Sequence, residues 1–183
     1  MAKPKARFER EDWIDLGLEL LRRDGPDGLT LERLTEAASK TRGSFYHHFE
    51  DHDAFLAALA ERWLGEETDA VIALADAAAR TGRRREALAR RATKVDHALE
   101  RELRRLAAVA PVVAAVVAKS DERRIVYVTR LFRAEFGLDE KEALARGRIQ
   151  HCAFVGAQMV FPDADERFWI RHLATLGATL WRR

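Results

Sequence analysis

Residues 41–49, which read Thr-Arg-Gly-Ser-Phe-Tyr-His-His-Phe, constrain the fold of this chain more than any other stretch. Thr41 can cap the start of a short helix, because its hydroxyl accepts a hydrogen bond from an amide of the first turn. Phe45 and Phe49 lie four residues apart, so a helix points both rings to one side, which we expect to be buried. The other side then carries an arginine, a serine, a tyrosine and two histidines, a mixture typical of a helix that lies in a DNA groove.

These nine residues alone leave a second interpretation open, in which they form part of a small helical hairpin and the histidines face solvent. The preceding residues favour the first interpretation. We expect residues 31–38 to form another short helix with Thr30 as its cap, and only Ser39 and Lys40 separate the two helices. Two short helices joined by so tight a turn are typical of a helix-turn-helix, in which the second helix reads DNA.

The stretch from Leu29 to Phe55 resembles the DNA-binding domain of the TetR (tetracycline repressor) family. The resemblance rests on Leu29-Thr30, Leu34-Thr35-Glu36-Ala37-Ala38-Ser39-Lys40-Thr41, Gly43-Ser44-Phe45-Tyr46-His47-His48-Phe49 and His52-Asp53-Ala54-Phe55. It covers only the first third of the chain. The DNA-binding residues that it implies are Thr30, Lys40, Thr41, Arg42, Gly43, Ser44, Tyr46, His47 and His52. Of these, we expect Arg42 to contact a base, because its guanidinium matches O6 and N7 of guanine.

Three residues depart from the pattern of the family. Ser39 stands at the usual turn glycine, where a left-handed backbone costs a non-glycine residue roughly 1 kcal/mol. Lys40 replaces an apolar residue of the turn, so its aliphatic stem must lie across apolar surface. His52 replaces a lysine that contacts phosphate in many members, which weakens one DNA contact near neutral pH. The fold prediction is unchanged by these departures.

The rest of the chain is predicted to be helical, and the fold all-α. We expect a three-helix DNA-binding domain over residues 1–50 and a helical ligand-binding and dimerisation domain over residues 51–183. Apolar residues at helical spacing predict a first helix at 7–23, and a long fourth helix capped by Asp51 and ending near Gly82. The later predicted segments are 84–98, 100–109, 112–137, 141–160 and 166–181. Asp139 and Asp163 are the expected caps of the last two, each with a glutamate three residues later.

The last two predicted helices are rich in small residues, among them Gly156 and Gly177, together with phenylalanine and tryptophan. In the TetR resemblance these helices pair with their copies, so the chain is expected to be a homodimer that matches a two-fold operator. The alternative is that they pack only within one protomer.

Composition restricts the class of protein. A net charge of +2 does not mark a generally basic DNA binder, and Met1–Ala60 holds nine Lys and Arg against twelve Asp and Glu. The local basic groups are Lys3, Lys5, Arg7 and Arg10 on an N-terminal arm, with Lys40 and Arg42 at the turn. The single cysteine, Cys152, excludes an intrachain disulfide and suits the cytoplasm. No signal peptide is expected, because Met1–Arg10 is polar and basic. No membrane span is expected either, because the longest apolar run, Ala107–Ala118, is short and interrupted by Pro111.

No catalytic motif is found, so we expect neither an enzyme, nor a cofactor, nor a metal site. The neighbours His151 and Cys152 point about 100° apart on a helix and do not face each other. The resemblance implies an unknown small-molecule effector. Candidate residues for its pocket are Trp63, His97, Tyr127, Phe132, His151, Phe154 and Gln158. The sequence thus predicts a transcriptional repressor released from a double-stranded DNA operator by a small molecule. The competing class is a helical ligand-binding protein or enzyme that has lost DNA binding.

Overall fold

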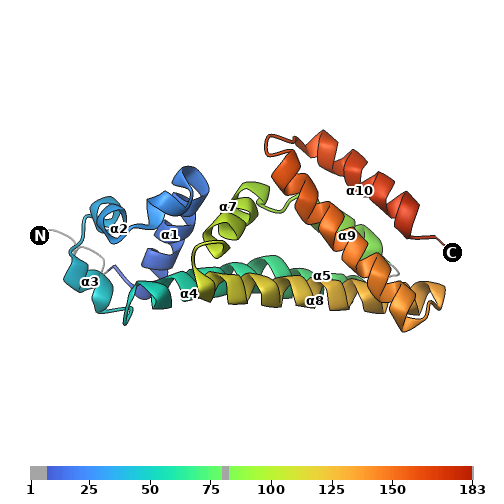
Figure 1. Cartoon of the computed structure of the whole chain (residues 1–183), viewed down its shortest axis with the longest axis horizontal. Coiled ribbons are helices and arrows are strands. Elements are labelled where there is room, and N and C mark those ends of the chain that lie inside the picture. Colours follow the sequence, from blue (N-terminus) through green and yellow to red (C-terminus); the bar gives the residue numbers. More distant parts are fainter. Residues whose placement is uncertain (1–7, 80–82, 183) are drawn as a thin grey trace, which may run out of the picture.

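The computed structural model describes residues 8–79 and 83–182. The predicted arm residues Lys3, Lys5 and Arg7, and the predicted helix end at Gly82, lie outside the described residues. The described parts contain helices and no strand, which confirms the all-α prediction. Helices α1 to α3 gather at one end of an elongated molecule, and long helices extend from them to the other end (Figure 1). None of the described helices is long and apolar enough to cross a membrane.

The N-terminal helices begin and end where the sequence places its capping signals. α1 spans Arg10–Asp24 and begins where the Glu9 N–H donates to the Asp12 carboxylate at 2.7 Å. It ends at Gly25, whose φ of 70° a residue with a side chain rarely adopts. The 3₁₀ turn η1 (Pro26–Leu29), α2 (Leu31–Ala38) and α3 (Arg42–Tyr46) follow. The predicted reading helix is thus shorter than residues 41–49, because a turn over residues 47–48 ends it.

The predicted fourth helix contains a π-helical insertion. α4 (His52–Leu64), the π-helical segment η2 (Gly65–Asp69) and α5 (Ala70–Ala79) follow one another without a break. Leu64 and Ala70, on either side of η2, have helical φ and ψ, so the three segments run as one rod. The remaining helices are α6 (Arg84–Ala92), α7 (His97–Ala107), α8 (Pro111–Phe136), α9 (Glu140–Val160) and α10 (Glu166–Leu180). The predicted break near residue 99 is therefore wrong, because Asp96 caps α7 through the Leu99 N–H.

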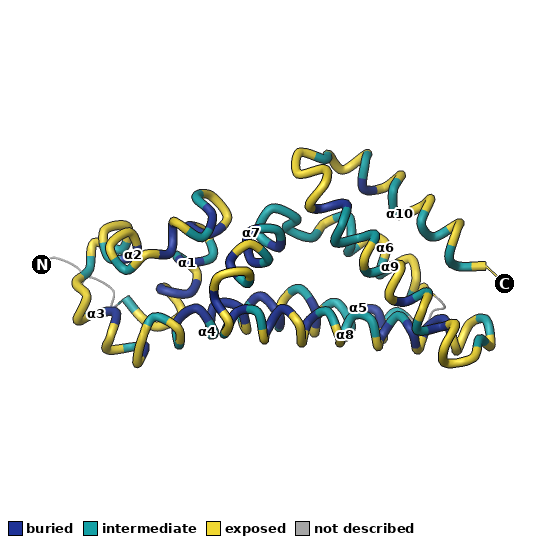
Figure 2. Tube along the Cα trace, in the orientation of Figure 1, coloured by how far each residue is buried: buried dark blue, intermediate teal, exposed yellow. Residues whose placement is uncertain are grey.

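One hydrophobic core joins the N-terminal helices to the long rod. Phe45 of α3, Phe55 of α4 and Trp63 further along α4 are almost fully buried in the same cluster, which continues to Val113 of α8. Figure 2 shows buried residues along α1, α4 and the adjoining part of α8, whereas most of α10 is exposed or intermediate. α4 is therefore shared by the two ends of the molecule.

The predicted caps of the last two helices differ in outcome. Asp139 caps α9 by accepting a hydrogen bond from the Glu142 N–H at 2.9 Å, as expected. The prediction that Asp163 caps α10 is wrong, because Asp165 accepts from the Phe168 N–H at 2.8 Å instead. The Ala164 N–H donates to the Phe161 carbonyl at 3.1 Å, and this turn carries the chain past Asp163 before the helix begins.

Candidate functional site

The two short helices α2 and α3 are held by the side chains that the sequence indicated. Thr30 caps α2 by accepting from the Arg33 N–H at 3.3 Å, and Thr41 caps α3 by accepting from the Ser44 N–H at 3.2 Å. Phe45 is fully buried, and the Phe49 and Phe55 rings lie 5.2 and 5.3 Å from its ring. The predicted inward face of α3 is confirmed, so its other face is fixed by packing.

The outward face of α3 carries the polar residues in the predicted arrangement. Thr41, Arg42, Gly43, Tyr46 and His47 are exposed. Ser44 is half-buried beside them, and Tyr46 keeps 49% of its surface exposed. The Arg42 guanidinium forms an ion pair with Glu32 of α2, and both side chains are largely exposed. A solvated pair of this kind contributes little to stability, which leaves the guanidinium able to exchange its partner.

The three departures from the family pattern are accommodated locally. Ser39 has a φ of 51°, the left-handed conformation expected at this turn. The Lys40 ammonium lies 5.6 Å from the centre of the Phe8 ring, so its stem covers apolar surface, as predicted. His52 lies at the first residue of α4, and its Nε2 is 2.7 Å from the Leu29 carbonyl oxygen. This contact ties the start of α4 to Leu29, the residue before the cap of α2.

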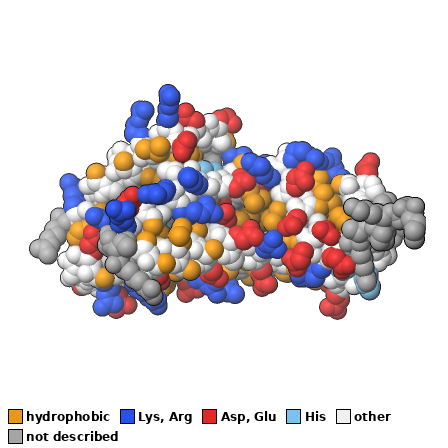
Figure 3. Space-filling model, turned by 180° about the vertical axis from the view of Figure 1, so that it is seen from behind, with side chains coloured by type: hydrophobic (Ala, Val, Ile, Leu, Met, Phe, Trp, Pro, Cys, Tyr) orange, Lys and Arg blue, Asp and Glu red, His pale blue; other side chains and the backbone are white. Residues whose placement is uncertain are grey.

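His48, which the sequence placed on the outer face, also turns toward the protein. It is half-buried, and its Nε2 lies 3.2 Å from the Phe8 carbonyl oxygen. The exposed basic surface of α3 is therefore small. On the face seen in Figure 3, basic and acidic side chains are interspersed, in agreement with the small net charge of +2.

A second feature is a cavity of about 570 Å³ in the C-terminal half of the molecule. Its wall comes from η2, α5, α6, α8, α9 and α10. Most of the wall is apolar, with Val71, Ile72, Leu88, Val95, Leu173 and Leu176. Three aromatic rings, those of Tyr127, Phe154 and Trp181, also line it. An apolar cleft of this size with a few polar groups is typical of a small-molecule site.

The N-terminal segment matches a known protein family. Residues 14–59, which run from α1 through the helix-turn-helix into α4, match the model described as bacterial regulatory proteins, tetR family. This segment therefore resembles the DNA-binding segment of the tetR family. The match covers a quarter of the chain, and no curated protein sequence is significantly similar to the chain.

The whole fold is similar to that of two solved transcriptional regulators. The crystal structure of Escherichia coli NemR in its reduced form superimposes with a TM-score of 0.71 at 18% identity, over 92% of this chain and 95% of that chain. A transcriptional regulator from Rhodococcus sp. Rha1 superimposes with a TM-score of 0.77 at 16% identity, over 93% of this chain and 95% of that chain. At such low identity, these likenesses establish the fold only.

The structure separates the predicted pocket residues into two groups. Tyr127, His151 and Phe154 line the cavity. The other four, Trp63, His97, Phe132 and Gln158, do not line this cavity. Trp63 and Phe132 are almost fully buried in the packing between helices. His97 Nδ1 lies 3.0 Å from Gln158 Nε2, and the His97 ring stacks on Trp169 at 3.8 Å.

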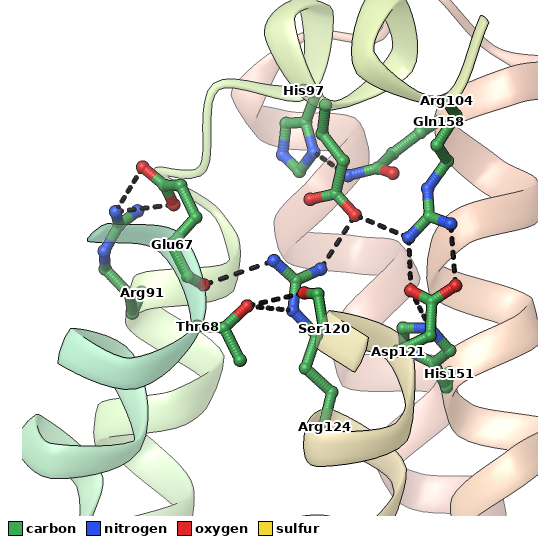
Figure 4. Close-up of polar contacts among 11 residues, drawn as sticks. Glu67, Thr68, Arg91, His97, Arg104, Ser120, Asp121, Arg124, His151 and Gln158 are labelled. Carbon is green, nitrogen blue, oxygen red and sulfur yellow. Dashed lines mark hydrogen bonds and ion pairs between the residues drawn. The ribbon is translucent and has the colours of Figure 1, made fainter. Parts of the chain in front are cut away.

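A buried polar network lies behind the cavity and was not predicted from the sequence (Figure 4). Glu100 of α7 is fully buried, and its Oε1 accepts from Arg104 at 3.0 Å and from Arg124 of α8 at 2.7 Å. Arg104 also donates to both oxygens of Asp121, at 2.7 and 3.0 Å. His151 Nε2 donates to Asp121 at 2.9 Å. The network therefore joins α7, α8 and α9.

The π-helical segment η2 is attached to the same network. Arg124 donates to the Thr68 hydroxyl at 2.9 Å and to the Glu67 carbonyl oxygen at 3.2 Å. Thr68 is buried, and its hydroxyl lies 2.7 Å from that of Ser120. These contacts hold a turn that widens the rod where it passes the cavity, and π-helical turns of this kind often occur at functional sites.

The carboxylates of the network are stabilised in their charged form. Burial raises the pKa of Glu100, but the charges of Arg124 and Arg104 outweigh burial and place this pKa below its ordinary value. Burial likewise opposes ionisation of Asp121, and hydrogen bonds from His151 and Arg104 reverse the effect and lower its pKa. The sequence signal for this site is weak, because only the Glu100–Arg104 spacing of four residues is local.

Proposed function

We propose that this tetR-family regulator is a homodimeric repressor, acting in the cytoplasm, that a small molecule releases from a two-fold operator. In this proposal residues 1–50 bind DNA, and residues 51–183 bind the effector and form the dimer. The observation that carries the proposal is the outward face of α3. Its polar residues are held in place from below by the buried Phe45.

The proposed DNA contacts follow from the positions of the side chains. Arg42 is proposed to exchange Glu32, its exposed partner, for the major-groove edge of a guanine. Tyr46 and His47 are proposed to contact phosphates, and the start of α2 at Thr30 to contact another. Lys40, Thr41, Gly43 and Ser44 complete the proposed surface. We assign His52 a positioning contribution through its contact with Leu29.

The dimer proposal is supported by the apolar surface of α9 and α10. Ile149, Met159 and Ile170 are between 46% and 54% exposed within one protomer, and Phe161 between the helices is 49% exposed. A Cβ atom added at Gly156 of α9 would meet no other atom within 4 Å, so space for a second chain exists at this position. Apolar surface of this extent is typical of a protein interface.

A gel-shift assay on the promoter region flanking the gene tests the DNA-binding part of the proposal. Arg42→Ala should weaken binding to the preferred operator by about 1–3 kcal/mol and relax the preference for its sequence. Arg90→Ala is the matched control, because Arg90 is equally exposed and paired with Glu86 on α6. Unchanged sequence preference in Arg42→Ala would show that another residue reads the bases.

A further inference from the structure

The chemical class of the effector can be deduced from the charges around the cavity, provided that the cavity is the effector site of the proposed function. The polar side chains of the wall already have partners in the protein. Arg91 lies 2.7 Å from both carboxylate oxygens of Glu67, and both side chains are largely buried. Tyr127 donates to Asp76 at 2.7 Å, and Trp181 donates to Gln150 at 2.7 Å.

The charges behind the wall are balanced as well. Three guanidinium groups, those of Arg91, Arg104 and Arg124, face three carboxylates, those of Glu67, Glu100 and Asp121. Arg104 and Arg124 expose only 13% and 14% of their side chains, so solvent screens these charges weakly. At the rim, Arg85 is paired with Glu135 at 3.0 Å, and Glu86 with Arg90 at 2.5 Å.

A charged ligand gains little binding free energy in such a site. It would lose its hydration on entering, and it would either remain without a counterion or have to displace one member of an existing buried pair. An uncharged ring compound avoids this cost, because it replaces water along the aliphatic wall and can stack on Phe154, Tyr127 or Trp181. We infer that the effector is an uncharged, mainly apolar ring compound, and that the Glu67–Arg91 pair excludes anions from the cavity.

Two fluorescent probes that differ by a single anionic group test this inference. N-phenyl-1-naphthylamine is uncharged, and 8-anilinonaphthalene-1-sulfonate carries the same rings with one sulfonate. The wild-type protein should bind the uncharged probe at least about tenfold more tightly, measured by the rise in probe fluorescence on titration. Equal affinity for the two probes, or tighter binding of the sulfonate, would overturn the inference.

Because the uncharged probe also prefers apolar sites in general, variants supply the decisive comparison. Glu67→Gln leaves Arg91 without its carboxylate and should tighten binding of the sulfonate probe by about tenfold, with the uncharged probe nearly unchanged. Glu66→Gln is the matched control, because Glu66 is the neighbouring residue, is exposed and pairs with Arg62 outside the cavity. If both variants change sulfonate binding equally, the Glu67–Arg91 pair does not select the ligand.

Two further variants keep the test decisive if Glu67→Gln fails to fold. Arg91→Gln leaves the Glu67 carboxylate unpaired, so sulfonate binding should weaken by about tenfold while binding of the uncharged probe persists. Gly177→Phe should fill the cavity, since Gly177 lines it and an added Cβ meets no atom within 4 Å. Loss of both probes in Gly177→Phe supports binding in the cavity. Retained binding of the uncharged probe would overturn its assignment there.

An operator gel shift with each probe separates this inference from the proposed function. If the uncharged probe binds the cavity but leaves operator affinity unchanged, the inferred class of ligand is retained. The proposal that a ligand in this cavity releases the operator is then refuted. If the sulfonate releases the operator while the uncharged probe does not bind, release stands and the ligand class is overturned.

Discussion

Replacement of Glu100 by glutamine should destabilise the protein strongly, although the two side chains have nearly the same shape. The wild-type carboxylate is fully buried and accepts from two guanidinium groups, at 2.7 and 3.0 Å. In the variant, both arginines keep their other partners, Asp121 for Arg104 and Thr68 for Arg124. One buried positive charge is nevertheless left without compensation.

The magnitude follows from these contacts. Removing one partner of a buried ion pair typically costs about 3–5 kcal/mol, and the remaining partners of both arginines place Glu100→Gln near ~3 kcal/mol. For a chain of this size, that loss should lower the midpoint of thermal unfolding by about 6–12 °C. Unfolding should be followed by circular dichroism at a fixed protein concentration, because the proposed dimer would make the midpoint concentration-dependent.

A control and a double variant identify the cause of the loss. Glu86→Gln removes an exposed carboxylate paired with Arg90 and should change stability by less than about 0.5 kcal/mol. Glu100→Gln combined with Arg124→Gln should be less destabilised than the sum of the two single variants, by about 1–3 kcal/mol. If Glu100→Gln unfolds at the wild-type temperature, or if the effects of the two substitutions add exactly, the ion pair does not stabilise the fold.

Three other changes have clear expected outcomes. Ser39→Gly should raise the free energy of unfolding by about 0.5–1 kcal/mol in urea titrations, because glycine removes the strain of a φ of 51°; a destabilised variant would contradict this. The free energy of unfolding should fall as pH falls. Burial lowers the pKa of His97, so this group takes up a proton more readily in the unfolded chain than in the fold. The loss of stability should therefore begin near the ordinary histidine pKa of 6.5. The loss of stability should steepen below about pH 5, because Glu100 and Asp121 then take up protons in the unfolded chain, whereas their pKa values are lowered in the fold. Greater stability at pH 4 than at pH 7 would refute these lowered pKa values. Gly156→Glu should give monomers in sedimentation, because it places a charge on the proposed dimer surface without a clash inside the protomer, and a dimeric variant would exclude Gly156 from that surface.

The parts of the fold that were predictable from the sequence depend on contacts between near neighbours. Thr30, Thr41 and Asp51 each accept from an N–H three residues later, as helix caps do, and all three could be identified from residue type and position. The burial of Phe45 and Phe49 follows from a spacing of four residues. Asp163 was misassigned because a second aspartate follows two residues later, and only the turn before α10 selects Asp165.

The cavity was less predictable, because its wall depends on the π-helical segment η2. A π-helical turn shifts the residues that follow it around the helix axis relative to a regular α-helix. Trp63 precedes the segment and packs in the core, whereas Glu67 lies within it and lines the cavity. Long-range contacts hold this segment in place, such as that of Thr68 with Ser120 at 2.7 Å, and these residues are 52 positions apart. No local pattern in the sequence indicates such a contact.

The rod formed by α4, η2 and α5 is the element through which a ligand in the cavity could act on α3, and Thr68 offers a test. Phe55 near one end of the rod packs on Phe45 of α3, at a ring distance of 5.3 Å. Thr68 holds the other part of the rod against α8 through Ser120 and Arg124. In the proposed dimer, a ligand that binds better to one position of the rod would shift the spacing of the two copies of α3, with a coupling free energy of roughly 1–3 kcal/mol.

Thr68→Val keeps the shape of the side chain but removes both hydrogen bonds, so it should reduce the factor by which a cavity ligand weakens operator binding. Thr129→Val is the matched control, since Thr129 is also buried but its hydroxyl donates at 2.8 Å to Ile125 within α8 itself. Both variants should lose about 1 kcal/mol of stability, because each loses buried hydrogen bonding. Only Thr68→Val should lose coupling, measured as operator affinity with and without the uncharged probe. If the two variants retain equal coupling, the rod only supports the fold, and the effect of the ligand must reach α3 through α7, which packs against α1 and η1.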